Sequence, residues 1–285
     1  MAEDKAVTME ALEARMKSYV QRVDQALSSE LKLYSHSRFH GPLVYSTEGG
    51  KRIRPVMLML SAEALGCTDD SVLGAAVAVE LLHTESIVHD DVIDDEKVRR
   101  GKVPFHVKYG YGASLLSADF VFATILAIAA RYDDRRIAEE VSNAAMQMSE
   151  GEYSELTIDP EIYRLTWDEY LRIVSDKTAS LFETSAKLGA LIAGGNEKEV
   201  KALAGYGRCI GIAYQLKDDL LDWRSKDKVS LGLLKTHSES EVVGKMAAQA
   251  QSYAEEAKRM LIHIPRNEAT IFLEDLSDFS ILREY

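Results

Sequence analysis

The chain has 285 residues, of which 46% are hydrophobic, and its formal net charge at pH 7 is −12. That length and apolar content are enough to bury a large core, either in one helical unit or in two domains. The acidic balance argues against binding to nucleic acid or to an anionic membrane surface.

Apolar residues recur at three- and four-residue steps along most of the chain, which is the spacing of amphipathic helices. The first predicted helix covers residues 8–34, with Thr8 as its N-cap. A short turn is predicted at residues 41–50, and the second helix begins at Pro55, because proline is favoured in a first helical turn. Further helices are predicted at about residues 71–94, 112–132, 135–156, 167–175, 179–193, 198–223, 239–262 and 267–282.

The pattern predicts an all-α bundle, because no strand-like alternation interrupts the helical spacing. The chain has five prolines and no low-complexity linker, which favours a single domain over residues 1–285. Helix 71–94 is apolar on nearly every side and is predicted to be central. The longest apolar run, residues 115–130, is interrupted by Asp119 and is too short to cross a membrane, so we expect no integral membrane segment.

Cysteine usage and the start of the chain both favour a cytoplasmic protein. Cys67 and Cys209 lack the spacing of a metal or redox site, and we expect both to behave as small buried side chains in a reducing compartment. Met1 leads into polar, acidic sequence without the pattern of a signal peptide.

Two aspartate clusters lie about half the chain apart, each at the end of an apolar, helix-competent stretch. Their members are Asp90, Asp91 and Asp94 in the first cluster, and Asp218, Asp219 and Asp222 in the second. Residues four apart share a helix face, so each cluster stacks two carboxylates that repel unless a cation neutralises them. Hard oxygen ligands suit Mg²⁺, which commonly bridges a carboxylate to a substrate phosphate. The implied ligand is a diphosphate, although an isolated cluster is also typical of a solvated acidic turn.

Several segments around the clusters carry a family resemblance. They are Gly-Gly-Lys-Arg-Ile-Arg-Pro at residues 49–55, residues 81–89, Arg-Arg-Gly at residues 99–101, Lys-Thr-Ala-Ser-Leu-Phe at residues 177–182, residues 211–217, and Leu273, Leu276, Phe279 and Arg283 near the end. In this order, and from about Leu43 onward, the chain resembles the trans-isoprenyl diphosphate synthases, or polyprenyl synthases, of the geranylgeranyl and polyprenyl type. The resemblance implies a helical bundle of the isoprenoid synthase type around a central apolar cavity.

The resemblance also implies a reaction and its metals. Such enzymes condense isopentenyl diphosphate with an allylic prenyl diphosphate, head to tail, using about three Mg²⁺ ions. By this resemblance Asp90 and Asp94 bind two ions and Asp218 the third. Asp91, Asp219 and Asp222 support them directly or through water.

The basic residues divide between two diphosphates. Lys51 and Arg54 lie three apart and could present both cations to isopentenyl diphosphate, with Arg52 either joining them or pointing to solvent. The resemblance adds His83 and Arg100 to that site, and assigns Arg99 and Lys177 to the allylic diphosphate. It places Thr178 and Gln215 beside the reacting carbons. A histidine on an apolar helix is also typical of an ordinary core residue, so His83 is open to both interpretations.

Two segments depart from the family pattern. The loop after Asp222 is shortened, and Leu233 stands where relatives place a lysine that helps to close the site; Lys228 or Lys235 could replace it. Residues 151–155 match the Gly-Gln-x-x-Asp pattern of relatives only loosely, and we assign them a supporting role.

The resemblance also implies that product length depends on the side chains five and four residues before Asp90, which are Glu85 and Ser86. Neither is aromatic, so nothing there forms a floor for a fifteen-carbon chain, and we predict a product of about twenty carbons or more. Glu85 needs a partner or a raised pKa in an apolar tunnel, or it turns toward a neighbouring helix. Phe120 and Phe122 are alternative floors.

Other functions remain open. A class I terpene cyclase or a head-to-head synthase would lack a second diphosphate segment like residues 49–55, and a regulatory subunit would have lost catalysis. Residues 112–132 are apolar on more than one face, whereas a lone surface helix shows a single stripe. We therefore expect a homodimer.

Overall fold

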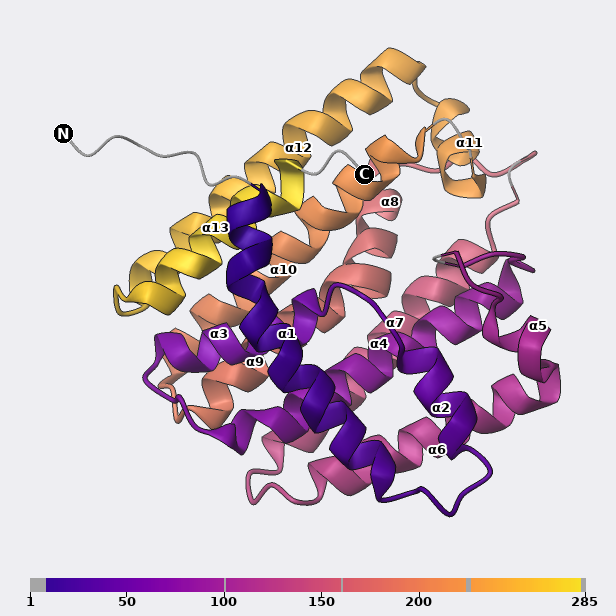
Figure 1. Ribbon diagram of the computed structural model, residues 1–285. Helices are drawn as coiled ribbons and strands as arrows, with labels where there is room; N and C mark the ends of the chain where they lie inside the picture. Colours follow the sequence, from indigo (N-terminus) through magenta and orange to yellow (C-terminus); the bar gives the residue numbers. More distant parts are fainter. Residues whose placement is uncertain (1–8, 100, 160, 224–226, 283–285) are drawn as a thin grey trace.

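The computed structural model describes residues 9–99, 101–159, 161–223 and 227–282 as a bundle of helices (Figure 1). Apart from one isolated bridge between Arg99 and Lys102, these ranges contain no strand pairing. The helices are α1 (Met9–Lys32), α2 (His40–Thr47), α3 (Ile53–Ala64), η1 (Asp70–Val72), α4 (Leu73–Ile93), α5 (Phe105–Tyr109), α6 (Tyr111–Ala129), α7 (Arg136–Leu156), α8 (Trp167–Val174), η2 (Ser175–Ala179), α9 (Ser180–Ile192), α10 (Glu197–Leu221), α11 (Lys228–Leu234), α12 (Glu239–Met260), η4 (Leu261–His263) and α13 (Glu268–Leu282). The predicted all-α class is confirmed.

Helix α4 lies in the core, as its apolar faces predict. Its side chains from Ala75 to Leu82 are buried among α1, α3, α6, α7 and α9. Helix α10 is the second central element, and it packs on α9, α12 and α13 (Figure 1). Each of these two helices ends at one aspartate cluster, so the packing of the bundle sets the distance between the clusters.

A π-turn, η2, interrupts the helix pair α8 and α9. Gly151 of α7 and Gly211 of α10 press against it from two sides: a Cβ on Gly151 would lie 2.3 Å from the Lys177 backbone nitrogen, and one on Gly211 would lie 2.5 Å from the Ala179 Cα. Only glycine permits such close approach of backbones. The turn is therefore held between the two helices, and π-turns of this kind are frequent at functional sites.

Three short helices were not predicted. The expected turn at residues 41–50 is instead largely α2, which carries Pro42 in its first turn and buries Leu43. Helices α5 and α11 have only five and seven residues, too few for a clear hydrophobic period. The predicted cap Thr8 lies outside the described residues, whereas the ends of the long helices agree with prediction to within three residues.

Two helical stretches are long and apolar enough to cross a membrane by length and composition, Asp70–Ile93 and Tyr111–Ala129. The apolar window of the first is 67% buried inside the fold, as expected of a core helix. That of the second is only 44% buried, and Leu115, Leu116 and Leu126 are exposed. The apolar run of α6 is thus partly exposed on the surface of the chain.

Candidate active site

The two aspartate clusters end their helices in the same way. Asp94 follows α4 as its C-cap and its N–H donates to the carbonyl of Asp90 at 2.9 Å. Asp222 follows α10 and donates to the carbonyl of Asp218, also at 2.9 Å. In each cluster the last helical turn therefore stacks the outer two aspartates along one edge.

The π-turn joins the two clusters through adjacent residues. Lys177 reaches the first cluster, where its ammonium lies close enough to Asp90 to alter the pKa of that carboxyl. The next residue, Thr178, donates its hydroxyl to Gln215 Oε1 on α10 at 2.8 Å. Because Gln215 also donates to Asp219, adjacent residues of η2 lie near both aspartate clusters.

Asp90 lies in a crowded acidic environment. The pKa of its carboxyl is raised to about 7, chiefly by burial; the Lys177 ammonium acts to lower this pKa, and the nearby carboxylates of Glu152 and Asp94 act to raise it. Burial alone would lower the pKa of Lys177, but Asp90, Glu155 and Glu152 together hold it above its usual value. The Lys177 ammonium lies 2.5 Å from Glu152 Oε2 and 2.9 Å from Glu155 Oε2. Residues 151–155, assigned only a supporting role from sequence, therefore hold the lysine of the site.

The second cluster is fixed by hydrogen bonds. Gln215 donates its amide to Asp219 Oδ1 at 2.7 Å, and Tyr170 donates its hydroxyl to Asp219 Oδ2 at 2.5 Å. Burial nevertheless raises the pKa of Asp219 to about 7, because these two hydrogen bonds only partly compensate for lost solvation. Because the Gln215 amide nitrogen donates to Asp219, the Gln215 amide oxygen is the atom that accepts from Thr178. No sequence pattern singled out Tyr170, which lies almost fifty residues upstream of its partner Asp219.

Asp91 and Arg99 form an ion pair. Arg99 donates from Nε to Asp91 Oδ1 at 2.6 Å, and Asp91 is buried. The pKa of Arg99 is raised, since the contacts with Asp91 outweigh the effect of burial. Asp91 thus supports the predicted allylic site through Arg99, while a metal contact from it remains a prediction. Arg100 lies outside the described residues.

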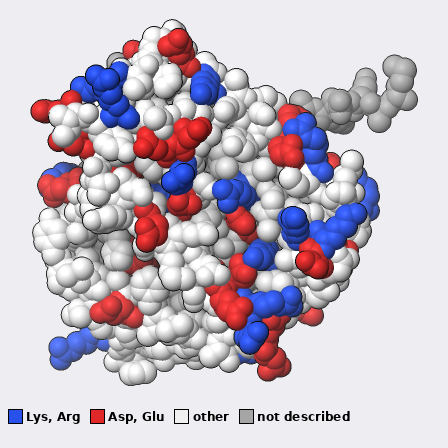
Figure 2. Space-filling model, turned by 180° about the vertical axis from the view of Figure 1, so that it is seen from behind, with Lys and Arg blue, Asp and Glu red and all other residues white. Residues whose placement is uncertain are grey.

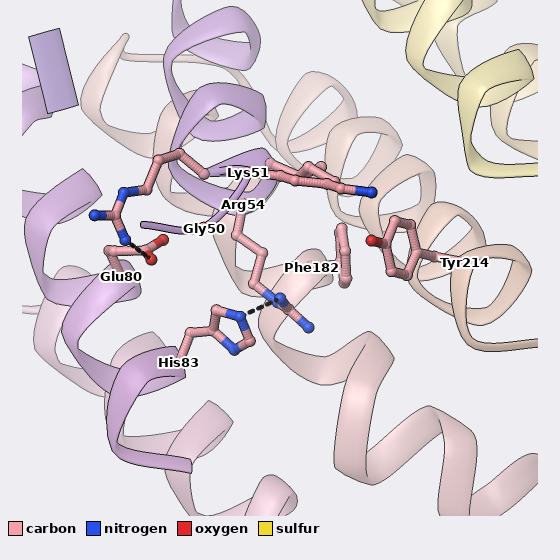
Figure 3. A pocket seen from close by; sticks show the side chains of 9 residues that line it. Gly50, Lys51, Arg54, Glu80, His83, Phe182 and Tyr214 are labelled. Atoms are coloured by element: carbon pink, nitrogen blue, oxygen red, sulfur yellow. Dashed lines mark hydrogen bonds and ion pairs between the residues drawn. The ribbon is translucent and has the colours of Figure 1, made fainter. Parts of the chain in front are cut away.

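The predicted second group of cations lines a cavity of about 400 Å³ (Figure 3). Lys51 and Arg54 enter it from one segment, and the Arg54 guanidinium lies 3.2 Å from His83 Nε2 on α4. Arg54 also stacks 4.2 Å above the centre of the Phe182 ring. Phe182 and Tyr214 complete the wall beside the cations (Figure 3). Both residues lie within segments that the sequence singled out, residues 177–182 and 211–217, but nothing in the sequence predicted that their rings would border a cationic cavity.

Arg52 differs from its two neighbours. Its guanidinium is buried and donates to Asp24 at 2.9 Å, to Glu80 at 2.5 Å and to the Thr47 carbonyl at 2.5 Å. The contacts with Glu80 and Asp24 hold the pKa of Arg52 above its usual value in spite of burial. Although Arg52 borders the cavity, its donors serve these protein acceptors, so the geometry favours a structural role over both substrate binding and the solvent-facing alternative.

Replacing Arg52 with methionine should therefore destabilise the fold. Loss of the buried ion pair leaves the Glu80 carboxylate without its closest cation, at a cost of about 3 to 5 kcal/mol in the free energy of unfolding. Denaturant unfolding of the two proteins measures this. Lys51→Met, at an exposed neighbour, serves as control and should change stability by about 0.5 kcal/mol or less. Equal stability of both variants would contradict the structural role.

Glu85 lies inside the fold, in a small apolar cavity between α2, α4, α5 and α6. Leu43, Val88, Phe105, Ala118 and Val121 line this cavity with it. His89, one turn later on α4, lies 2.6 Å from Glu85 Oε1, and this contact raises the pKa of His89. Glu85 therefore has the partner that a buried carboxylate requires. Ser86 is only partly buried and donates to the His83 carbonyl at 2.9 Å.

The donor set fits divalent metal ions. Within the described residues no three acidic or imidazole side chains form a ready-made cage. Mg²⁺, however, is commonly held by one or two carboxylates together with substrate phosphates and water. The raised pKa of Asp90, caused by burial and by Glu152 and Asp94, means that its charged form is disfavoured in the protein alone. A bound cation would stabilise that charged form. Asp90, Asp94 and Asp218 are the residues that would hold such ions.

Sequence comparison finds a matching family model and similar curated proteins. Residues 36–262 match the family model for polyprenyl synthetase. The chain is 38% identical over 190 residues to the short chain isoprenyl diphosphate synthase of Methanothermobacter thermautotrophicus, covering 65% of this chain and 58% of that protein. It is 36% identical over 203 residues to the geranylgeranyl diphosphate synthase of Methanosarcina mazei, covering 70% and 61%. The matched part thus spans about 60% of these relatives.

Solved structures match over nearly the whole chain. A polyprenyl synthase from Caulobacter crescentus, complexed with calcium and isoprenyl diphosphate, superposes with a TM-score of 0.85 at 27% identity and covers 99% of both chains. A geranylgeranyl pyrophosphate synthetase from Pyrococcus horikoshii also gives 0.85, at 28% identity, covering 96% of this chain and 99% of its own.

Proposed function

The chain belongs to the polyprenyl synthetase family, and we propose that it joins isopentenyl diphosphate head to tail to an allylic diphosphate, giving a trans-polyprenyl diphosphate. The observation that carries this proposal is η2, where Lys177 lies near Asp90 of the first cluster and Thr178 donates to Gln215, which in turn donates to Asp219 of the second cluster. The names of the relatives, including geranylgeranyl and octaprenyl diphosphate synthases, support the same class of reaction. We further propose that residues 1–285 act as one domain and that the protein is cytoplasmic.

In the proposed mechanism the allylic diphosphate lies between the clusters. Magnesium ions held by the aspartates would stabilise the charge that grows on the diphosphate as it leaves. Lys177 adds a charge-assisted contact to the same group. The oxygens of Thr178 and Gln215 are fixed in place by their mutual hydrogen bond and can steady the allylic cation. Apolar side chains behind them exclude water that would trap it.

The second substrate has its own cavity. Lys51 and Arg54 supply two cations for a diphosphate that needs no metal, and His83 holds Arg54 in place. A cyclase acting on one diphosphate has no use for this second cationic cavity, so the geometry favours a two-substrate condensation.

Product analysis tests the reaction directly. We expect purified protein with Mg²⁺, isopentenyl diphosphate and dimethylallyl, geranyl or farnesyl diphosphate to yield longer prenyl diphosphates. Conversion of the allylic substrate alone to a hydrocarbon would support a cyclase instead. No product from any primer, together with normal diphosphate binding, would support a regulatory subunit.

Glu85→Phe should shorten the dominant product toward about fifteen carbons. We propose that the prenyl tail enters the apolar cavity beside α4, about one and a half turns, or roughly 7 to 8 Å, below Asp90. A larger ring there cannot be absorbed easily, because packed interiors resist overfilling. Ser86→Phe is the matched variant, since Ser86 does not line this cavity. Chromatography of the products compares the two variants. Shortening by Ser86→Phe alone would mean that the side chain limiting product length lies on the other side of α4. Two unchanged product profiles would place that limit on another helix, with Phe120 and Phe122 as candidates.

We propose that the protein is a homodimer that pairs through α6. Leu115, Leu116 and Leu126 are each more than half exposed on this helix. In Figure 2 a broad area with few charged side chains lies on the side of the molecule where α5 and α6 run. Light scattering at micromolar concentration should give twice the chain mass of 31.7 kDa, and Leu116→Asp should shift it toward the monomer. A monomeric parent protein would reject the proposal.

A further inference from the structure

Two side chains of the α8–η2 segment hold α10 at positions one helical turn apart. Tyr170 of α8 donates its hydroxyl to Asp219 Oδ2 at 2.5 Å. Thr178 of η2 donates to Gln215 Oε1 at 2.8 Å. Gln215 and Asp219 are four residues apart on α10, and the Gln215 amide donates to Asp219 Oδ1 at 2.7 Å. The four side chains therefore form one closed hydrogen-bond network between α8–η2 and α10.

The direction of each hydrogen bond in this network follows from the groups that make it. Burial and the neighbouring Asp219 carboxylate raise the pKa of Tyr170 well above its usual value, so its hydroxyl keeps the proton that it donates. An ionised carboxylate accepts hydrogen bonds and cannot donate them, so Asp219 attracts the NH₂ end of the Gln215 amide. The amide oxygen of Gln215 is thereby directed toward Thr178.

Asp219 differs from a carboxylate that is free to bind a metal ion. Each of its two oxygens already accepts a hydrogen bond from the protein, one from Tyr170 and one from Gln215. A metal ion bound directly to Asp219 would have to share an oxygen with one of these donors. The geometry therefore favours a positioning role for Asp219 over the direct metal contact that the resemblance allowed.

Tyr170 is fixed in place by contacts that involve no ligand. Its side chain is only 1% exposed, and its ring centre lies 5.1 Å from that of Trp167. The Trp167 indole N–H donates in turn to Gln249 of α12 at 3.1 Å. Thr166 and Glu169 form a capping box that stabilises the start of α8. The position of the Tyr170 hydroxyl is therefore set by α8 and α12.

We propose that Tyr170 is a positioning residue of the condensation, which acts through Asp219 to fix the direction of the Gln215 amide. This inference rests on the proposed function, because it takes Gln215 to lie beside the reacting carbons. Without the Tyr170 hydroxyl, Asp219 loses one of its two fixed contacts, and the Gln215 amide is less constrained. An amide that turns its NH₂ group toward the allylic cation destabilises it, so the loss falls on the chemical step and not on substrate binding.

Steady-state kinetics of Tyr170→Phe test this at pH 8, above the pKa of about 7 of Asp219. We expect kcat to fall by about tenfold, and the KM for each substrate to stay within about twofold of the parent value. Tyr206→Phe is the matched control, because Tyr206 is fully buried and donates its hydroxyl to the Leu273 carbonyl at 2.7 Å, between α10 and α13. Both variants lose one buried hydroxyl and should lose similar stability, but Tyr206→Phe should keep the parent kcat.

A double variant tests whether Tyr170 acts through Gln215. Gln215→Ala should lower kcat by itself, and adding Tyr170→Phe should then cause no further loss, because side chains of one network do not contribute additively.

Calorimetry with inorganic diphosphate and Mg²⁺ tests the role of Asp219. Asp219→Ala should lower kcat by about tenfold or more and leave diphosphate affinity within about threefold of the parent. Asp218→Ala, which removes a proposed metal ligand one residue earlier, should weaken that affinity by more than about tenfold. Equal losses of affinity in the two variants would contradict the positioning role of Asp219.

The outcomes separate this inference from the proposed function. A parent protein that condenses the substrates, with a Tyr170→Phe variant of unchanged kcat, overturns the inference alone. Equal losses of kcat in Tyr170→Phe and Tyr206→Phe, or additive losses in the double variant, overturn it too. A parent protein that makes no condensation product overturns both. Should Tyr170→Phe fail to fold by circular dichroism, Asp219→Ala takes its place in the double variant with Gln215→Ala, and additive losses there overturn the inference.

Discussion

Replacing Asp90 or Asp218 with asparagine should lower turnover by about a thousandfold and leave the fold intact. Each change keeps the shape of the side chain and removes the negative charge that a divalent ion requires. The two residues lie on different helices, α4 and α10, so similar losses in both variants would show that both helices serve one metal-dependent site. Excess EDTA should abolish activity of the parent protein, and added Mg²⁺ should restore it. Full turnover in EDTA would contradict the metal requirement.

Although Asp90→Asn should lower turnover, it should raise the free energy of unfolding at alkaline pH. The pKa of this carboxyl is raised to about 7 in the folded protein, chiefly by burial, compared with about 3.9 in an unfolded chain. The folded state therefore binds more protons across this window, and stability is lost as the pH rises from about 4 to 7. At pH 8 without metal the asparagine variant should be more stable by on the order of 2 kcal/mol. Asp95→Asn, at an exposed neighbour that pairs with Lys97, is the control and should change neither turnover nor stability much.

The helical spacing of apolar residues, repeated along most of the chain, was enough to predict the fold class. The steps of three and four residues predicted the long helices, and the apolar faces of α4 predicted its central position. Helices α2, α5 and α11 escaped prediction because each has eight residues or fewer, and contacts from elsewhere stabilise them. The π-turn escaped because close contacts with Gly151 and Gly211, distant in sequence, hold it.

In the candidate active site, too, features set by local spacing could be predicted and contacts between distant residues could not. Spacing of four residues predicted the stacked aspartates, since helix geometry fixes that relation locally. It could not distinguish Arg52 from Lys51 and Arg54, because the carboxylates that engage Arg52, Asp24 and the buried Glu80, come from other helices. The resemblance to relatives assigned Glu152 and Glu155 little weight, whereas their carboxylates bind Lys177, a lysine that lies beside Asp90. Local pattern thus predicts which residues carry charge, and packing decides which of those charges meet.

The basic residues should divide between the two substrates when they are removed one at a time. Lys51→Ala and Arg54→Ala should weaken binding of isopentenyl diphosphate by about 10- to 100-fold, because each loses a charge-assisted contact in the cavity beside His83. Lys177→Ala should instead weaken binding of the allylic diphosphate by a similar factor. It should also lower kcat, since the ammonium faces the group that gains charge in the transition state.

Separate titrations with isopentenyl diphosphate and with a non-ionisable allylic analogue measure this division. Lys201→Ala, an exposed lysine near the N-terminal end of α10, is the control and should affect neither ligand. The Lys177 variant carries a further expectation: Glu152 and Glu155 lose their shared cation, so the acidic environment of Asp90 becomes more repulsive and the protein should need metal ions more strongly for stability. A larger rise in Tm with Mg²⁺ in Lys177→Ala than in the parent would support that coupling. Equal losses for both ligands in all three variants would mean that the two cationic groups do not serve different diphosphates.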